Sequence, residues 1–269
     1  YMYDGGSTST EIFTATGQDS SLSGFSVSAN FAAVGSSSSD SMSLNVRRSS
    51  SDTDKYITGN MTITMGDGND SLSAARFIDG DSVDMGAGDD TVDIYTDNSN
   101  GTSTYAALSM TKLDGGTGTD TLSFAESGDS GSAEINLSSG GAVNFENLIG
   151  NGNAQVVRGN AADNIISGDG GADTIYGGSG NDTLYAQSAA SNNPDDQDTD
   201  NDNLYGEAGN DTLIASKGDN ILDGGTGADT ITTGSGSDTI VLRVGDGGST
   251  LAAADIITDF TDGTDVLGM

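Results

Sequence analysis

Carboxylates at nine-residue intervals are the residues of this chain best placed to do chemistry. Between Gly159 and Val241 the sequence repeats the pattern Gly-Gly-x-Gly-x-Asp-x-aliphatic-x, and the clearest copy runs from Gly177 to Tyr185. Position six of the in-phase copies is filled by Asn164, Asp173, Asp182, Asp202, Asp211, Asn220, Asp229 and Asp238. The glycines around these residues are Gly168, Gly171, Gly177, Gly178, Gly180, Gly206, Gly209, Gly224, Gly225, Gly227, Gly234 and Gly236.

Each nine-residue unit is expected to form a tight turn followed by a short strand. Glycine supplies the positive φ angles of the turn, and alternation along the strand points only position eight inward. The inward residues are then Ile166, Ile175, Leu184, Leu204, Leu213, Leu222, Ile231 and Ile240. One unit buries almost nothing, so it is stable only when it is stacked on its neighbours.

Successive turns are expected on alternate edges of a flattened coil, so that one coil takes two repeats. One edge would carry Asn164, Asp182, Asp211 and Asp229, and the other would carry Asp173, Asp202, Asn220 and Asp238. Each edge is then a column of carboxylates and backbone carbonyls spaced about 4.8 Å apart. A hard divalent cation with six to eight oxygen ligands fits this arrangement, which indicates calcium rather than magnesium. Zinc is disfavoured further because the chain has no His and no Cys.

These repeats resemble the repeats-in-toxin (RTX) family of haemolysin-type calcium-binding repeats. The resemblance implies an all-β fold, a right-handed parallel β-roll or β-solenoid with several calcium ions between stacked turns. It also implies that the position-six side chains and the carbonyls of the neighbouring glycines are the ligands. The run from Asn144 to Asn160 resembles the first coil of such rolls. Asn164 and Asn220 carry no charge, so we expect weaker calcium binding there.

Four segments are expected along the chain: a Ser/Thr-rich β region (1–58), an irregular β-solenoid (59–158), the RTX β-roll (159–241) with an insertion at 186–196, and a C-terminal segment (242–269). We predict strands at Glu11–Ala15, Phe25–Phe31, Met42–Val46 and Tyr56–Ile57 in the first segment. The second segment contains isolated relatives of the repeat that present Asp70, Asp90 and Asp120. These turns are either further calcium sites or plain Gly-Asp turns. The run from Asp255 to Leu267 resembles the C-terminal region of RTX proteins exported by type I secretion, and it is equally suited to cap the roll.

Composition excludes several classes of function. The formal net charge is −33, from 41 acidic and 8 basic residues, which argues against nucleic-acid binding because phosphate contacts need Lys and Arg. No apolar run reaches the length of a transmembrane helix, and the first residues are unlike a signal peptide. A chain without His and Cys cannot build a Ser-His-Asp triad, a thiol nucleophile or a His-ligated zinc site, so we do not expect an enzyme.

Three functions remain open. The first is a secreted protein of the S-layer or adhesin type, expected at the cell surface of a Gram-negative bacterium, that folds on calcium outside the cell. Its partners would be calcium and either further copies of itself, in a lattice or fibre, or a cell-surface polysaccharide. The second is the calcium-dependent secretion and folding tail of an RTX hydrolase or toxin whose active domain lies upstream of Tyr1. The third is a module that binds ice or glycan, although Ile165, Asn203 and Ile221 interrupt the threonine rows that an ice-binding face needs.

Overall fold

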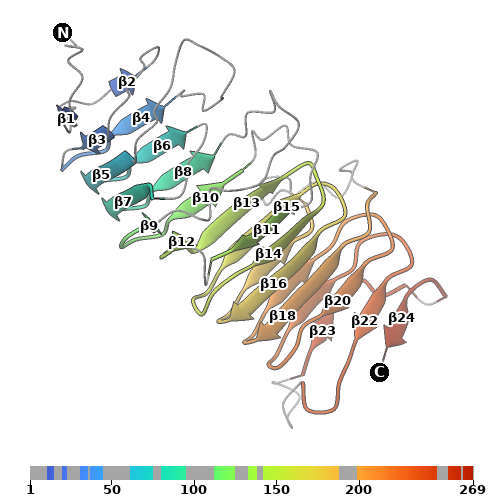
Figure 1. Ribbon diagram of the computed structural model, residues 1–269. Coiled ribbons are helices and arrows are strands. Elements are labelled where there is room, and N and C mark those ends of the chain that lie inside the picture. The colour runs from blue at the N-terminus through green and yellow to red at the C-terminus, as the bar shows by residue number, and fades with distance from the viewer. Residues whose placement is uncertain are drawn as a thin grey trace.

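The chain forms an elongated stack of short parallel strands (Figure 1). The computed structural model describes residues 11–14, 20–22, 31–35, 37–44, 61–74, 80–94, 112–124, 133–137, 142–187, 199–246, 254–261 and 263–268. Every named strand in these ranges pairs with parallel neighbours, and none of these residues is helical. No described segment therefore forms a helix that could span a membrane. The predicted all-β parallel solenoid is confirmed.

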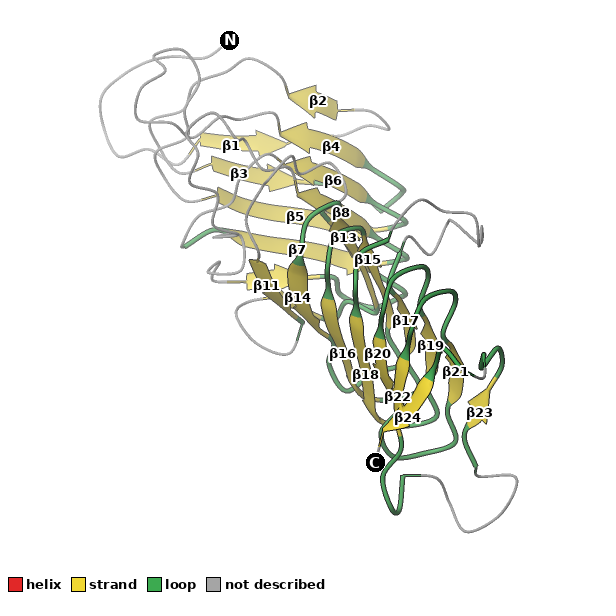
Figure 2. Cartoon of the chain, turned by 90° about the vertical axis from the view of Figure 1, so that its right-hand side faces the viewer, coloured by secondary structure: helices red, strands yellow, loops and turns green. Residues whose placement is uncertain are grey.

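Three sheets form the sides of the stack (Figures 1 and 2). The six-stranded sheet contains β1 (Glu11–Thr14), β3 (Phe31–Val34), β5 (Met61–Asp67), β7 (Ser82–Ala87), β9 (Lys112–Asp114) and β12 (Ala142–Val143). The eleven-stranded sheet contains β2 (Ser20–Leu22), β4 (Ser41–Leu44), β6 (Ser71–Ala74), β8 (Thr91–Ile94), β10 (Thr121–Ser123), β13 (Asn147–Asn151), β15 (Ile165–Asp169), β17 (Thr183–Tyr185), β19 (Thr212–Ile214), β21 (Thr230–Thr232) and β23 (Ile256–Ile257). The seven-stranded sheet contains β11 (Ala133–Asn136), β14 (Gln155–Arg158), β16 (Thr174–Ser179), β18 (Asn203–Ala208), β20 (Ile221–Asp223), β22 (Thr239–Val241) and β24 (Val266–Gly268).

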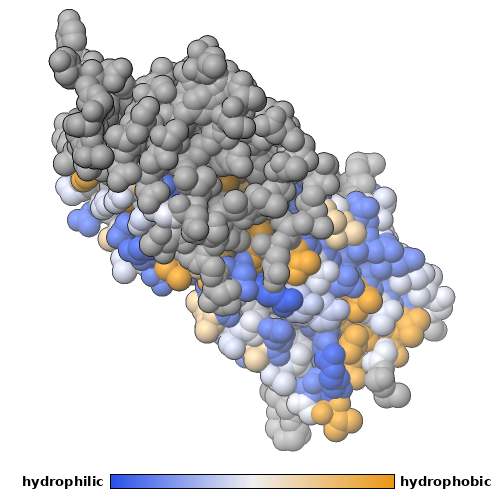
Figure 3. All heavy atoms as spheres, viewed as in Figure 1, coloured by the Kyte–Doolittle hydropathy of each residue, from blue (hydrophilic) through white to orange (hydrophobic). Residues whose placement is uncertain are grey.

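The core consists of aliphatic side chains stacked in files along the sheets, with about one inward residue per strand in the C-terminal half and several on β5, which buries Met61, Ile63 and Met65. In the eleven-stranded sheet the register stacks the inward residues in the order Met42, Leu72, Val92, Leu122, Leu148, Ile166, Leu184, Leu213, Ile231 and Ile257. All eight residues predicted at position eight of the repeat have at most 1% of their surface exposed. Outward residues of the same strands reach solvent, such as Ile165 at 46% and Ile221 at 37%. Hydrophilic and hydrophobic residues are accordingly interspersed over the C-terminal half of the face in Figure 3.

The spacing between equivalent turns widens after β17. Equivalent turn residues of neighbouring coils are 18 residues apart at Asn164 and Asp182, but 29 apart at Asp182 and Asp211. Leu184 still pairs with Leu213, so the added residues leave the stack without disturbing it. Most of the predicted insertion, 186–196, lies outside the described residues, as does the loop expected at 96–105.

Around β11 and β12 the six-stranded sheet ends and the seven-stranded sheet begins. β12 is the last strand of the six-stranded sheet, and β11, which precedes it in the chain, is the first strand of the seven-stranded sheet. The eleven-stranded sheet runs through this junction without interruption. Phe124 and Phe145 are the two largest fully buried side chains among the described residues, and both lie in this part of the chain. The junction therefore holds the bulkiest part of the core.

Both ends of the chain add strands to the same sheets. Within 1–58, β3 pairs with β5 and β4 pairs with β6, so these strands are further coils of the solenoid. The expected strands at Phe25–Phe31 and Tyr56–Ile57 lie almost wholly outside the described residues. At the other end β23 extends the eleven-stranded sheet and β24 extends the seven-stranded one, as a strand-turn-strand cap would.

Candidate calcium-binding turns

Half of the position-six side chains stack along one edge of the solenoid, each directly before a strand of the eleven-stranded sheet. The backbone N–H of Asn164 donates to Oδ1 of Asp182 at 2.7 Å, and that of Asp182 donates to Oδ1 of Asp211 at 2.7 Å. The N–H of Asp211 donates in turn to Asp229 at 2.8 Å, and that of Asp229 donates to Asp255 at 3.1 Å. The edge predicted from the period is therefore present, and each carboxylate accepts a backbone hydrogen bond from the turn of the preceding coil.

The isolated turns of the N-terminal half belong to the same column. The N–H groups of Asp40, Asp70 and Asp90 donate to the carboxylates of Asp70, Asp90 and Asp120 at 2.7, 2.7 and 2.8 Å. The N–H of Asp120 donates to Oε2 of Glu146 at 2.8 Å, and Asn147 after Glu146 pairs with Ile165 after Asn164. We call this whole set the first column, and its members are Asp40, Asp70, Asp90, Asp120, Glu146, Asn164, Asp182, Asp211, Asp229 and Asp255.

A second column precedes the strands of the seven-stranded sheet. Its members are Gln155, Asp173, Asp202, Asn220, Asp238 and Asp265, joined by the same N–H to side-chain oxygen bonds at 2.7, 2.8, 2.9, 2.8 and 3.2 Å. This is the second edge that the two-repeats-per-coil arrangement predicts. Sequence reasoning missed five column members: Asp40, Glu146, Gln155, Asp255 and Asp265. Each is followed two residues later by Met, Leu, Val or Ile in register with the core-facing residues of the next strand, although Leu267 after Asp265 is 49% exposed. The missed signal was therefore an acidic or amide residue, any residue and an aliphatic one, without the glycines of the repeat.

Buried carboxylate oxygens with no hydrogen-bond partner mark these turns. Among the described residues, Oδ2 is buried and has no such partner at Asp70, Asp90, Asp120, Asp182, Asp211, Asp229 and Asp238. Each of these seven residues is at most 2% exposed. A buried ionised group without a partner is costly, so the arrangement is stable when a cation or a proton binds there.

Two glycines of the clearest repeat show why the turn excludes side chains. At Gly177 an added Cβ would overlap Oδ2 of Asp182 and would come within 2.9 Å of the carbonyl oxygen of Gly206 in the next coil. The unpartnered carboxylate oxygen and a carbonyl of the following turn therefore lie on the same side of Gly177. Gly180 has a φ of +122°, and a Cβ there would meet the carbonyl of Ala162 at 2.5 Å. Backbone carbonyls of successive turns thus approach each other too closely for any residue but glycine.

Burial raises the pKa values of the seven aspartates that have an unpartnered oxygen. The pKa of Asp182 rises to about 7, and those of Asp70, Asp120 and Asp211 rise to about 6. Loss of solvent is the main cause in each case, and the neighbouring carboxylates of the column add to it. The backbone N–H of the preceding coil opposes the rise without cancelling it. Near neutral pH these carboxyl groups can thus bind either a proton or a metal ion.

The donor set fits a hard cation that is held largely by backbone oxygen. Within the described ranges no three acidic side chains converge in the way that an all-carboxylate site requires. Ligands at each turn would therefore combine one or two column carboxylates with turn carbonyls, which suits the mixed oxygen coordination of calcium.

Comparison with protein families supports this assignment. Four copies of the RTX calcium-binding nonapeptide repeat match residues 149–184, 198–231, 205–240 and 214–248. The chain contains RTX calcium-binding repeats over these residues. Its repeats bind several calcium ions along the stack. The matches leave out residues 185–197, which agrees with the insertion predicted at 186–196. No curated protein matches the chain.

The family match and the columns differ in extent. The matched RTX repeats begin at residue 149, but the first column continues back through Glu146, Asp120, Asp90 and Asp70 to Asp40. Which of these residues hold calcium is a prediction, and the strongest candidates are the seven aspartates with an unpartnered oxygen. The glycines predicted as carbonyl ligands line the same turns, between the column residues of successive coils.

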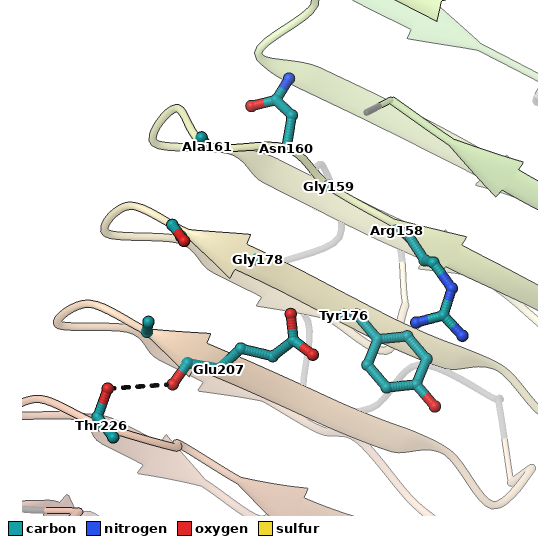
Figure 4. Close-up of a pocket in the computed structure, with 10 residues that line it drawn as sticks. Arg158, Gly159, Asn160, Ala161, Tyr176, Gly178, Glu207 and Thr226 are labelled. Atoms are coloured by element: carbon teal, nitrogen blue, oxygen red, sulfur yellow. Dashed lines mark hydrogen bonds between the residues drawn. The ribbon is translucent and has the colours of Figure 1, made fainter. Parts of the chain in front are cut away.

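A shallow groove on the outer face of the seven-stranded sheet is separate from the unpartnered column oxygens (Figure 4). Arg158 and Tyr176 lie on neighbouring strands there, with the guanidinium 4.0 Å from the ring centroid. Tyr176 also stacks on Tyr205, with the ring centroids 4.9 Å apart and the planes 12° from parallel. Arg158 and Tyr205 thus cover the ring faces of Tyr176, and a sugar could not stack on that ring without displacing one of them.

Proposed function

We propose that this chain is a secreted calcium-binding structural protein of the cell surface, of the S-layer or adhesin type, which folds and assembles on calcium outside the cell. The observation that carries the proposal is the buried column of unpartnered carboxylate oxygens, which extends well beyond the matched RTX repeats. All described strands belong to one continuous stack, so the described part of the chain is scaffold from end to end. A scaffold of this kind is what a surface layer or stalk requires.

Calcium would act as the switch between unfolded and folded chain. Extracellular calcium modules bind with dissociation constants of roughly 10⁻⁴–10⁻³ M. At about tenfold excess over that constant each bound ion adds roughly 1.4 kcal/mol, so about six ions add on the order of 8 kcal/mol. That sum is comparable to the whole stability of a domain, which is about 5–15 kcal/mol. At micromolar calcium the contribution vanishes, and repulsion within a chain of net charge −33 dominates.

Far-ultraviolet circular dichroism against calcium tests the folding half of the proposal. We expect most of the strand signal to be lost in excess chelator at neutral pH and to return in millimolar calcium, with magnesium at the same concentration as the control. A full strand spectrum in chelator would contradict the proposal.

Assembly is tested by electron microscopy of the calcium-loaded chain. Sheets or fibres that dissolve in chelator would support a lattice-forming surface protein of a Gram-negative bacterium. The competing function is the secretion and folding tail of an RTX hydrolase or toxin, which the resemblance of Asp255–Leu267 to type I export segments favours. Calcium-loaded particles that stay monomeric at every concentration would favour that tail. Retention of the chain on cell-surface polysaccharide would instead support an adhesin.

A further inference from the structure

Two successive turns of the stack are closed by side-chain amides instead of carboxylates. These are turns 150–155 and 159–164, which flank β14 and end in Gln155 and Asn164. In the first, Oε1 of Gln155 accepts from the N–H of Asn151 at 3.2 Å. In the second, Oδ1 of Asn164 accepts from the N–H of Asn160 at 2.8 Å. In both turns the amide oxygen therefore bonds the backbone N–H of position two of its own turn.

The amide nitrogens of these residues satisfy carbonyl oxygens. Nε2 of Gln155 donates to the carbonyl of Asn151 at 3.0 Å and also to the carbonyl of Asn153. Nδ2 of Asn164 donates to the carbonyl of Glu146 at 3.2 Å. Nδ2 of Asn160 donates to the carbonyl of Phe145 at 3.0 Å. These carbonyl oxygens thus accept hydrogen bonds from side-chain N–H groups, whereas in the aspartate turns a cation would bind the carbonyl oxygens.

Turns that end in Asp182, Asp211, Asp229 or Asp238 have the opposite character. Each leaves one buried carboxylate oxygen without a hydrogen-bond partner, whereas no side-chain atom of Gln155 or Asn164 is in that condition. Asn220 shares the bond between coils with the aspartates, because its Oδ1 accepts the N–H of Asp202 from the preceding coil at 2.9 Å, although its Nδ2 also donates to the carbonyl of Gly218 at 3.2 Å. An amide at position six is therefore not sufficient, and the conformation of the turn also matters.

The backbone of the two amide-closed turns differs from that of the other repeats. Turns built around aspartate contain left-handed residues at positions two and four, for example Gly178 at φ +113° and Gly180 at φ +122°. The structure describes turns 150–155 and 159–164 completely, and none of their residues lies in that region. Position four is Asn153 in one and Ala162 in the other, where the repeat calls for glycine. Sequence and backbone thus agree that these turns follow another plan.

The bulkiest buried side chains of the described residues lie in and next to this coil. Phe145 belongs to the coil and Phe124 to the one before it, and both are fully buried, whereas each later coil contributes mainly single aliphatic side chains. The coil is bonded to the preceding one through the N–H of Phe124 to the carbonyl of Ile149 at 2.8 Å, and through the N–H of Leu137 to the carbonyl of Arg158 at 2.9 Å. An aromatic side chain buries about 150–250 Å², so apolar burial replaces part of what metal supplies elsewhere.

We infer that residues 145–164 form a calcium-independent coil that stands between two calcium-dependent parts of the solenoid, because Gln155 and Asn164 close its turns with their own N–H donors. This coil, with the residues packed on it, keeps its structure at calcium concentrations where the roll after it has unfolded. It therefore provides the template on which calcium stacks the following repeats. The inference rests on the proposed calcium-dependent folding of the roll and adds where that folding starts.

Hydrogen exchange of the full chain, followed by mass spectrometry during a calcium titration, tests the inference. In excess chelator we expect peptides from 145–164 to stay protected while those from 199–241 exchange at once. The test variant is Gln155→Glu with Asn164→Asp, which restores carboxylates to both turns, and Asn164→Asp alone is the milder version. Because each removes an amide donor and adds a buried charge, we expect protection of 145–164 in chelator to fall by about tenfold or more. Added calcium should restore it.

The matched control is Asn220→Asp, the same chemical change in a turn that follows the aspartate pattern. It should strengthen calcium binding of the roll and leave the protection of 145–164 in chelator unchanged. Equal exchange of 145–164 and the roll in wild-type chain without calcium would overturn the inference, and so would unchanged protection in both test variants. Full protection of the roll in chelator would instead refute the proposed calcium-dependent folding, so the two failures are distinguishable.

Discussion

Replacing Asp211 by Asn should change stability in opposite directions with and without calcium. Asp211 is 1% exposed, and its Oδ1 accepts the N–H of Asp182 at 2.7 Å, while its Oδ2 has no hydrogen-bond partner. An Asn side chain retains an oxygen for the first bond, as Asn220 does for Asp202. The substitution therefore removes the charge of the turn while it preserves the hydrogen bond between coils.

The magnitude follows from the two states of the carboxylate. Burial raises the pKa of Asp211 to about 6, so keeping it ionised without metal near pH 7.5 costs about 1–2 kcal/mol after allowance for solvent screening. Asp211→Asn should stabilise the metal-free fold by that amount. With calcium in tenfold excess it should lose a ligand and roughly 1.4 kcal/mol, or about twice that if two neighbouring ions share the residue.

Urea unfolding in calcium and refolding by the osmolyte trimethylamine N-oxide in chelator, both followed by circular dichroism, measure the two effects. Asp219→Asn is the matched control, because the position-five oxygens of Asn201 and Asp219 accept equivalent backbone N–H bonds, both at 2.8 Å. That control removes the same charge at an exposed position and should shift neither curve appreciably. A fall in stability of equal size in both buffers would refute the reasoning, since it would mean that Asp211 acts through its hydrogen bond alone.

Three further predictions follow from the same geometry. Burial raises the pKa of Asp182 to about 7, so the stability of the metal-free chain should be greatest below about pH 4 and should fall as pH rises through 7. The calcium concentration at the folding midpoint should rise as pH falls, because protons compete with calcium for the carboxylate. Thermal melts in chelator with the same midpoint between pH 5 and 8 would contradict this. Gly180→Ala should cost about 2–4 kcal/mol in calcium, because its φ is +122° and the added methyl meets Ala162, whereas a Cβ at Gly152 has no atom within 4 Å and Gly152→Ala should be nearly neutral. Leu184→Ala should cost about 2–5 kcal/mol by emptying a fully buried position, and the truncation Ile165→Ala, on the outward face at 46% exposure, should cost far less; equal losses in thermal melts would mean that the core is not where the register places it.

The sequence predicted those features of the site that depend on residues close together in the chain. The nine-residue period, the inward position eight and the two edges were all predictable, because glycine, carboxylate and aliphatic residues recur locally and every unit is stacked in the same way. The metal type was predictable from the oxygen-rich, His- and Cys-free composition.

Only the tertiary structure placed the isolated turns and the amide-closed coil. Asp70, Asp90 and Asp120 are separated by 20 and 30 residues, so their common column follows from non-local strand pairing and not from any local period. Glu146 and Gln155 have no repeat of their own, and the register of β13 and β14 alone aligns them with the aspartates. Likewise, only the structure shows that Nδ2 of Asn164 donates to the carbonyl of Glu146 in the preceding coil, and that the turns of Gln155 and Asn164 contain no left-handed residue. The locally repeated residues determine which oxygen atoms are available to bind a metal, whereas the long-range stacking of strands determines which of those atoms lie close together.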